Sequence, residues 1–177
     1  AIQMTMLCIV AACDRTETGP AADEQVAAVE NVEAMAREHA DDNAEPSEAA
    51  LAEPQKAVTA ERLAYAEVGD ELVYGHFAFP SDMIEPLPAV IMIHEWWGLN
   101  DNIRSMAEQL AGEGYIVLAV DLFSDQVATT PEAARQLMMR AVENRDSLIS
   151  NMEQAYAFVT QTAGAPRVAS LGWCFGG

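Results

Sequence analysis

The sequence is short of basic residues. Of its 177 residues, 9 are Lys or Arg and 28 are Asp or Glu, which gives a formal net charge of −19. A chain of this charge repels polyanions, so nucleic acid and anionic membrane surfaces are not expected as partners. Long apolar runs are also missing, since none reaches the roughly 18 residues that a membrane-spanning helix needs. We therefore expect membrane attachment only through a lipid.

Cysteine is equally scarce. Cys8 and Cys13 lie near the start of the chain and Cys174 lies near its end, which suggests no disulfide framework. No C-x-x-C pair and no evident resolving cysteine accompany Cys174, so a thiol redox protein is the least favoured of the function classes considered.

The segment from Met4 to Cys13, MTMLCIVAAC, is short and apolar and ends in small residues and a cysteine. Its length suits the apolar region of a secretory signal. The residues Val10-Ala11-Ala12-Cys13 resemble the lipobox of bacterial lipoproteins, which implies that Cys13 carries the lipid anchor. In such proteins Asp after the cysteine, here Asp14, is associated with retention at the inner membrane. We expect a lipid-anchored protein on the periplasmic side of the inner membrane, with a soluble periplasmic protein, or a buried strand with an incidental cysteine, as alternatives.

Residues 14–60 are rich in Ala, Glu and Asp and include Pro20, Pro46 and Pro54. Between Asp14 and Lys56 there are twelve acidic and three basic residues, a net charge of −9. Low hydrophobicity with self-repulsion predicts a disordered, solvated linker rather than an interaction site. A thin stripe formed by Val26, Val29, Val32 and Met35 could line one side of a short helix.

Residues 61–177 have the patterns of a folded domain. Gly69-Asp70 separates two alternating runs, as in a β-hairpin. Continuous apolar runs predict buried strands at 89–93, 115–120 and 167–173, and apolar periodicity predicts helices at 102–113, from 130, and at 146–161. Strands alternating with helices predict an α/β fold with a parallel sheet.

The chain ends in SLGWCFGG, in which Gly172 and Gly176 bracket Cys174 with the spacing G-x-C-x-G after a predicted strand. In α/β-hydrolases this spacing marks the sharp turn that carries the nucleophile. Only the thiolate attacks, and the start of a helix after the turn favours that anion. The alternative interpretation is a buried, inert cysteine.

Three segments in this order, IHEWWGLN, AVDLF and GWCFGG, resemble the dienelactone hydrolase family of α/β-hydrolases, over roughly Glu67 to Gly177. The resemblance implies an α/β-hydrolase fold, a small-molecule ester or lactone substrate and no cofactor. It implies Cys174 as nucleophile, Glu95 as the carboxylate that contacts and activates the thiol, and the backbone N–H groups of Trp96 and Phe175 as oxyanion-hole donors. Glu95 also follows a predicted strand, at the sheet edge where α/β active sites assemble. Without the resemblance, it could be a surface acid.

HEWWG begins like the zinc motif H-E-x-x-H, but its fifth residue is Gly98 and the segment follows a strand, so no metal site is predicted. We expect His94 to be structural, and Trp96 and Trp97 to be cleft wall or core. One departure concerns the substrate. Where family members that act on carboxylate-bearing lactones have an arginine, this chain reads Ser124-Asp125.

All three histidines precede Cys174, whereas the triad order in this fold is nucleophile, acid, histidine. We therefore expect the acid and the histidine beyond Gly177. On this interpretation the chain comprises a signal remnant (1–13), a linker (14–60) and an incomplete α/β-hydrolase domain (61–177), a fragment that is inactive and poorly stable alone. The alternative is a non-catalytic binding or scaffold lipoprotein on a hydrolase fold. The oligomeric state stays open.

Overall fold

A computed structural model of the protein describes residues 22–46 and 48–177. The signal-like segment and its Cys13 lie outside the described residues. Within them, no helix is long and apolar enough to cross a membrane.

The first two strands form the predicted hairpin. Strand β1 (Val58–Val68) pairs antiparallel with β2 (Glu71–Pro80). Gly69 and Asp70 join them with φ angles of 59° and 66°. Two successive positive φ angles are typical of the turn that matches the twist of paired strands, and this confirms the hairpin.

The sheet has five strands in the order β1-β2-β4-β3-β5. Strands β3 (Ala89–Ile93), β4 (Ile116–Val120) and β5 (Val168–Gly172) run parallel, with β3 between the other two. The parallel sheet is therefore confirmed for these three strands. The hairpin extends it, because β2 pairs antiparallel with β4.

Strand β5 differs from the prediction of a buried strand. It lies at the edge of the sheet, paired only with β3 among the described residues. Ala169, Ser170 and Leu171 are exposed, Leu171 to 38%. A continuous apolar run indicates burial only where elements cover both faces, and here the described elements leave β5 largely uncovered.

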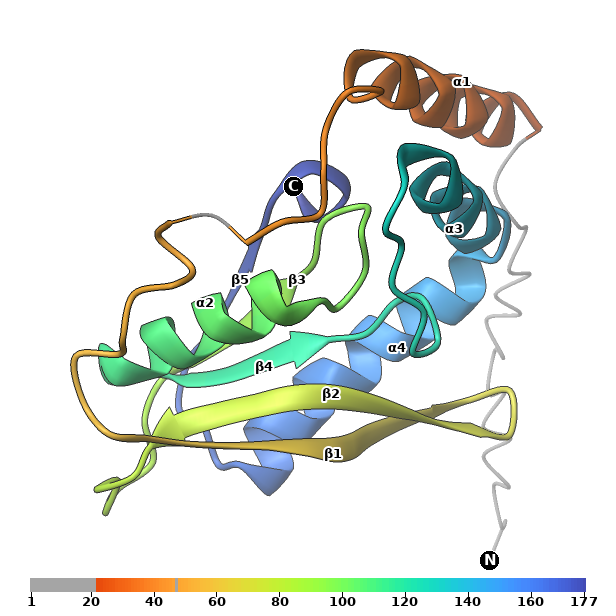
Figure 1. Ribbon diagram of the computed structural model, residues 1–177. Coiled ribbons are helices and arrows are strands. Elements are labelled where there is room, and N and C mark those ends of the chain that lie inside the picture. Colours follow the sequence, from red (N-terminus) through yellow and green to blue (C-terminus); the bar gives the residue numbers. More distant parts are fainter. Residues whose placement is uncertain (1–21, 47) are drawn as a thin grey trace, which may run out of the picture.

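Helices cover both faces of the sheet (Figure 1). Helix α2 (Asp101–Gly112) lies on one face, and α4 (Arg145–Ala157), which continues as one π-helical turn, lies on the other. Helix α3 (Pro131–Glu143) lies beyond the carboxyl ends of the strands. Asn100 caps α2 and Thr130 caps α3 through their side-chain oxygens, so the helix predicted from residue 130 is confirmed.

Each face of the sheet has its own core. Under α4, the apolar side chains of β3 and β4 pack with Tyr65, Phe77 and Val159. Under α2, the opposite side chains of these strands pack with Ile103 and Ala107. Packing on both faces holds the carboxyl ends of these strands in place, and the three motif segments of the sequence lie at those ends.

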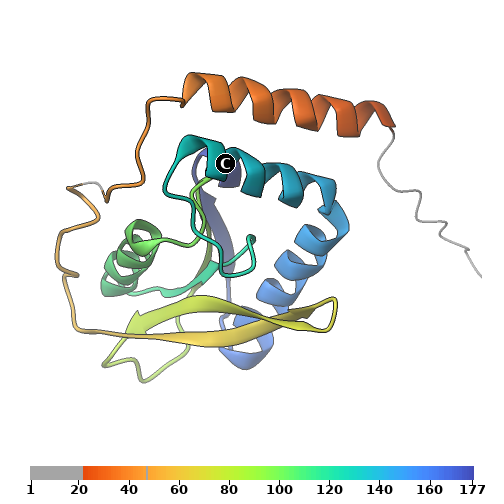
Figure 2. The same ribbon diagram turned by 45° about the vertical axis from the view of Figure 1, so that its right-hand side comes forward.

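A further helix, α1 (Ala22–Glu38), lies in the region where composition predicts a disordered linker. It runs alongside α3 in both views (Figures 1 and 2). Val32 is 3% exposed, and it packs with Trp96, Trp97 and Met138. The structure differs from the linker prediction because this thin apolar stripe has a partner surface, and tertiary packing contributes most of the stability of short helices.

The chain then returns to β1 along α2. Ala50 is 2% exposed, and the side-chain amide of Gln109 donates to the carbonyl oxygen of Ala49 over 2.6 Å. A Cβ atom at Gly112 would lie 3.0 Å from Pro54, so this part of the chain packs closely against the helix. It anchors α1 on its C-terminal side.

Candidate active site

Cys174 lies at a sharp turn between β5 and a single 3₁₀ turn, Cys174–Gly176. Its φ angle is 54°, in the left-handed region that residues with a side chain rarely adopt. A strained residue directly after a strand has the geometry of a nucleophile elbow.

The two glycines of the motif are needed because the backbone approaches itself closely. A Cβ atom at Gly172 would lie 2.0 Å from the carbonyl oxygen of Gly176. A Cβ atom at Gly176 would lie 2.7 Å from the carbonyl oxygen of Ile93, on the neighbouring strand β3. The sequence spacing therefore reflects packing as well as backbone freedom.

The Cys174 side chain is exposed, and its thiol contacts α1. The Sγ atom lies 3.4 Å from the Sδ atom of Met35. No hydrogen bond joins the thiol to Glu95 among the described residues. Nothing in the sequence motifs pointed to Met35, because it belongs to a segment without strong patterning.

Glu95 follows β3, at the same edge of the sheet as Cys174. Its side chain is partly buried, and this burial is the main reason that the pKa of Glu95 is raised above its ordinary value. The negative charge of Asp42, which follows α1, raises the pKa further. A carboxylate of raised pKa is a stronger proton acceptor.

The backbone N–H groups of Trp96 and Phe175 are the predicted oxyanion-hole donors, and each lies in a turn after a strand. The turn after Glu95 is closed by the N–H of Gly98, which donates to the Glu95 carbonyl oxygen over 3.2 Å. The turn at the elbow is closed by the N–H groups of Gly176 and Gly177. The N–H groups of Trp96 and Phe175 therefore take no part in closing either turn. The Trp96 side chain is buried in the core below α1, one of the two places predicted for it.

His94 is fully buried and connects these segments. Its Nε2 accepts from the backbone N–H of Leu122 over 3.1 Å, so its Nδ1 carries the proton and donates to the Glu95 carbonyl oxygen over 2.6 Å. Burial lowers the pKa of His94 to about 4. The ring lies against Phe123 and Phe175, with centroids 4.6 and 6.0 Å away. The structural role predicted for this histidine is confirmed.

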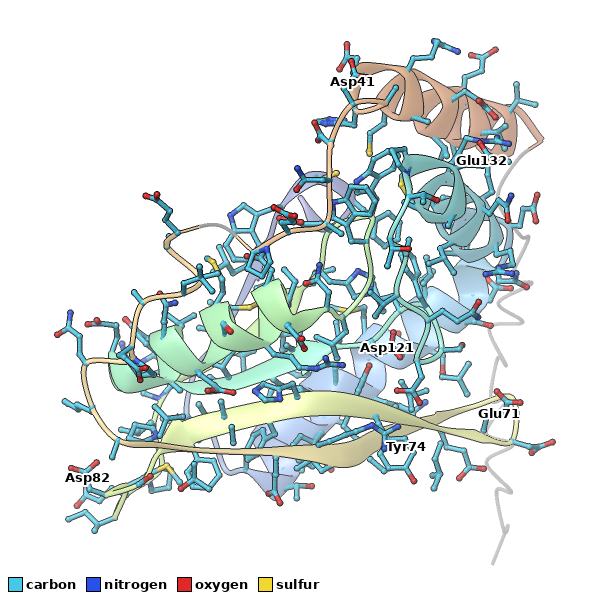
Figure 3. The ribbon with its side chains drawn as sticks, viewed as in Figure 1. Asp41, Glu71, Tyr74, Asp82, Asp121 and Glu132 are labelled. Atoms are coloured by element: carbon cyan, nitrogen blue, oxygen red, sulfur yellow. The ribbon has the colours of Figure 1, made fainter. Side chains whose placement is uncertain are left out.

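Asp121, at the end of β4, holds the next loop (Figure 3). Its buried carboxylate accepts from the backbone N–H groups of Phe123, over 2.8 Å, and Asp125. Phe123 in turn contacts Phe175, the residue after the nucleophile, at a centroid distance of 5.2 Å. Sequence reasoning assigned no role to Asp121, although AVDLF contains it; a carboxylate directly after a buried strand was the available signal.

An apolar groove and a more polar cavity lie near the carboxyl ends of the strands. An apolar groove of about 450 Å³ lies beside the elbow, lined by Phe175, Ile93 and Met152 among others. A more polar cavity of about 400 Å³ separates the hairpin turn from α3, and neither Cys174 nor Glu95 lines it. Within residues 22–46 and 48–177, no three His, Cys, Asp or Glu side chains gather as a metal site would require.

The profile of the Dienelactone hydrolase family matches residues 73–177, more than half of the chain. The chain belongs to the dienelactone hydrolase family. The matched region begins in β2 and includes Glu95, Trp96, Cys174 and Phe175. It confirms the resemblance drawn from the three motifs, and it places the protein in a family of hydrolases.

Individual relatives agree. A protein named "Putative carboxymethylenebutenolidase" from Aquifex aeolicus is 35% identical over 96 residues, which are 51% of this chain and 42% of that protein. Among solved structures, one named m3DLH has a TM-score of 0.61 at 28% identity. A dienelactone hydrolase-like promiscuous phosphotriesterase from metagenomic libraries has a TM-score of 0.60 at 26% identity. Both alignments cover 68% of this chain and 51% of the other, so the chain spans about half the length of the proteins that it matches.

Proposed function

We propose that the protein hydrolyses ester or lactone bonds with Cys174 as the nucleophile. The observation that carries this proposal is the strained φ angle of 54° at Cys174, held by Gly172 and Gly176 at the carboxyl end of a parallel strand. Strain at a residue with an exposed thiol costs stability and serves no packing purpose, which favours a chemical role over an inert cysteine.

In the proposed first step, Glu95 accepts the thiol proton and the Sγ of Cys174 attacks the substrate carbonyl carbon. The carbonyl π electrons move onto oxygen, and the backbone N–H groups of Trp96 and Phe175 stabilise the resulting oxyanion. The intermediate then collapses, the bond to the alcohol oxygen breaks, and the departing alkoxide takes the proton that Glu95 accepted from the thiol. The acyl group remains on sulfur. Burial of Glu95 supports this step, because its raised pKa brings its proton affinity closer to that of a thiol.

In the second step, water adds to the acyl carbon and the thiolate leaves. A general base that activates this water is needed. His94 cannot serve, because both of its ring nitrogens are engaged in the core.

The other two histidines are also paired. His76 pairs with Glu108, and a carboxylate oxygen of Glu108 lies 3.0 Å from Nε2 of His76. His39 pairs with Asp42 and lies against Trp96, and no contact joins it to Cys174 among the described residues. We therefore expect the 177 residues alone to turn over esters slowly at best.

The proposed substrate does not include a carboxylate-bearing lactone. Ser124-Asp125 stands where an arginine would bind the carboxylate of such a lactone, and the Asp125 carboxylate pairs with the Arg62 guanidinium over 2.7 Å. Because Asp125 already neutralises the charge of Arg62, this position offers an anionic lactone little attraction. A non-catalytic binding protein is the competing proposal, and it predicts binding without turnover.

The deciding experiment measures hydrolysis of p-nitrophenyl acetate by the gene product that carries this chain. Cys174→Ala should reduce turnover to the uncatalysed background, whereas Cys8→Ala, the matched control, should leave it unchanged. Undiminished hydrolysis by Cys174→Ala would refute the role of Cys174, and the absence of turnover in the unaltered protein would favour the binding protein.

A further inference from the structure

Helix α1 and the residues that follow it as far as Glu45 lie beside Cys174, and we call this segment the α1 wall. Its Met35 side chain contacts the thiol, with 3.4 Å between the two sulfur atoms. Val32, one turn earlier, is buried in the core that contains Trp96 and Trp97. His39, one turn later, lies against Trp96 with a centroid distance of 5.9 Å. Val32 and His39, which directly follows α1, therefore meet the loop after Glu95, and Met35 between them meets the thiol.

The helix is held in this position by polar contacts on either side. The guanidinium of Arg135, on α3, pairs with the Glu33 carboxylate over 2.5 Å. On the other side, the chain that follows α1 packs on α2 through Ala49 and Ala50. Both contacts hold α1 in the position that places Met35 beside the thiol.

The wall carries negative charge. From Val26 to Glu45 the sequence has six acidic residues and one basic residue. Figure 3 shows one of the acids, Asp41, at the end of α1. The next residue, Asp42, lies beside the loop that carries Glu95, because its carboxylate is 2.7 Å from Nδ1 of His39, whose ring lies against Trp96. Its charge also contributes to the raised pKa of Glu95. A second carboxylate brought to the same place would be repelled by both groups.

We propose that Met35 and Asp42 determine which acyl groups reach Cys174, and that they select uncharged, apolar acyl groups over carboxylate-bearing ones. Met35 supplies a soft apolar surface that contacts the acyl chain, and its bulk limits the chain's size. Asp42 supplies the repulsion that rejects an anionic group. The substrate class rests on the proposed function, whereas the contact of Met35 with the thiol does not.

The test therefore uses the thiol itself. Iodoacetamide and iodoacetate alkylate cysteine in the same way: the thiolate displaces iodide from carbon, and only the charge of the reagent differs. Rates are measured on the peptide that contains Cys174 by mass spectrometry, so Cys8 and Cys13 do not interfere. Met35→Ala should raise both rates, by about threefold to tenfold, because the neighbour of Sγ is removed. Asp42→Asn should raise the ratio of the iodoacetate rate to the iodoacetamide rate by about threefold, because any change in the reactivity of the thiol itself affects both reagents alike.

Matched controls lie on the same helix. Val26→Ala removes an apolar side chain that is exposed, and Glu30→Gln removes a charge on an exposed position; neither should change either rate. If Met35→Ala loses helical circular dichroism, Met35→Phe provides the opposite test, since a larger side chain should slow both reagents. Unchanged rates in both Met35 variants, or an unchanged reagent ratio in Asp42→Asn, would overturn the proposal.

Hydrolysis supplies the second readout. The unaltered protein should hydrolyse p-nitrophenyl acetate faster than its hemisuccinate analogue, and Asp42→Asn should narrow that difference. If the alkylation results are as expected while Cys174→Ala retains full hydrolysis, Met35 and Asp42 control access to Cys174 but the proposed function is wrong. If Cys174→Ala is inactive but the alkylation rates do not change in the Met35 and Asp42 variants, the proposed function is supported and the selective role of these two residues is refuted.

Discussion

The thioether sulfur of Met35 lies 3.4 Å from the thiol sulfur of Cys174, although 139 residues separate them in the sequence. The contact joins an acidic helix near the start of the described chain to the strained turn at its end. The Met35 thioether accepts a weak hydrogen bond from the thiol and shields it sterically, but it is not basic enough to take the thiol proton. Proton transfer from the thiol must therefore involve another group, and Glu95 is the carboxylate that follows the neighbouring strand β3.

Glu95→Gln should lower kcat/KM for a neutral ester by about 10²–10⁴-fold, the usual loss when a general base is removed. The amide keeps the shape of the side chain but cannot accept the thiol proton at neutral pH. Steady-state hydrolysis checks this, with Glu85→Gln, at an exposed position far from the elbow in sequence, as the control. A change below about threefold in the Glu95 variant would mean that this carboxylate is structural.

The acid side of the pH profile should depend on Asp42. Glu95 accepts a proton only when ionised, so kcat/KM falls as pH falls through its pKa, which burial and then Asp42 raise above the ordinary value. Asp42→Asn removes the second cause, which lowers the pKa of Glu95, and the acid limb should move to lower pH. The profile of kcat/KM between about pH 4 and 8 measures this shift. Glu30→Gln, which removes an equal charge on an exposed face of α1, should leave the limb in place; a limb unmoved in Asp42→Asn would contradict the coupling.

The parts of this site that were predictable from sequence are those in which local chemistry dictates geometry. The spacing of Gly172, Cys174 and Gly176 encodes a turn that only those residue types allow, and the structure shows it. Met35 could not be predicted in the same way. Its place depends on how α1 packs on α3. The acidic composition of this segment favours disorder, and the burial of a few side chains outweighs that tendency.

The same distinction applies to the strands. The hairpin at Gly69-Asp70 follows from turn chemistry and was predicted, whereas the apolar run at 167–173 by itself indicates a buried strand and does not show that Leu171 is exposed. An apolar run indicates that a strand packs on something, but it does not say which elements cover it. The order of the sheet places β5 at the edge, and that order depends on the whole topology.

Alanine at either elbow glycine should lower the free energy of unfolding by about 1–3 kcal/mol or more, the usual cost of overpacking. The new Cβ would lie 2.0 Å from a backbone oxygen at position 172 and 2.7 Å at position 176, and neither backbone oxygen can move away freely. Urea unfolding measures the change. Ser170→Ala, on the exposed part of the same strand, is the control and should change stability by less than about 0.5 kcal/mol. Wild-type stability in Gly172→Ala would show that the turn is looser than described.

The proposed lipid anchor is tested separately, because Cys13 lies outside the described residues. If the cysteine of Val10-Ala11-Ala12-Cys13 is lipidated, protein expressed with its native upstream sequence should sediment with membranes. Cys13→Ala should release it to the soluble fraction, because the acyl chains supply the membrane affinity. Cys8→Ala serves as the control and should not change the distribution. Equal retention of all three forms would exclude Cys13 as the anchor.

Tyr65→Phe should destabilise the fold and loosen the elbow, although Tyr65 is far from Cys174 in sequence. The Tyr65 hydroxyl donates to the Asn151 side-chain oxygen over 2.6 Å and accepts from the backbone N–H of Asp121 over 3.2 Å. All three groups are buried, so phenylalanine would leave a donor and an acceptor without partners. Each unsatisfied buried group costs about 1–3 kcal/mol.

The consequence should reach the site through the loop after β4. Asp121 positions Phe123, and Phe123 packs on Phe175 beside the nucleophile. Tyr65→Phe should therefore lower the midpoint of thermal unfolding and also raise the alkylation rate of Cys174, while Tyr156→Phe, at an exposed position, should change neither. A lower midpoint with an unchanged alkylation rate would show that the network supports the sheet without supporting the elbow. An unchanged midpoint would mean that water takes the place of the hydroxyl and that the hydrogen bonds of Tyr65 do not contribute to the stability of the fold.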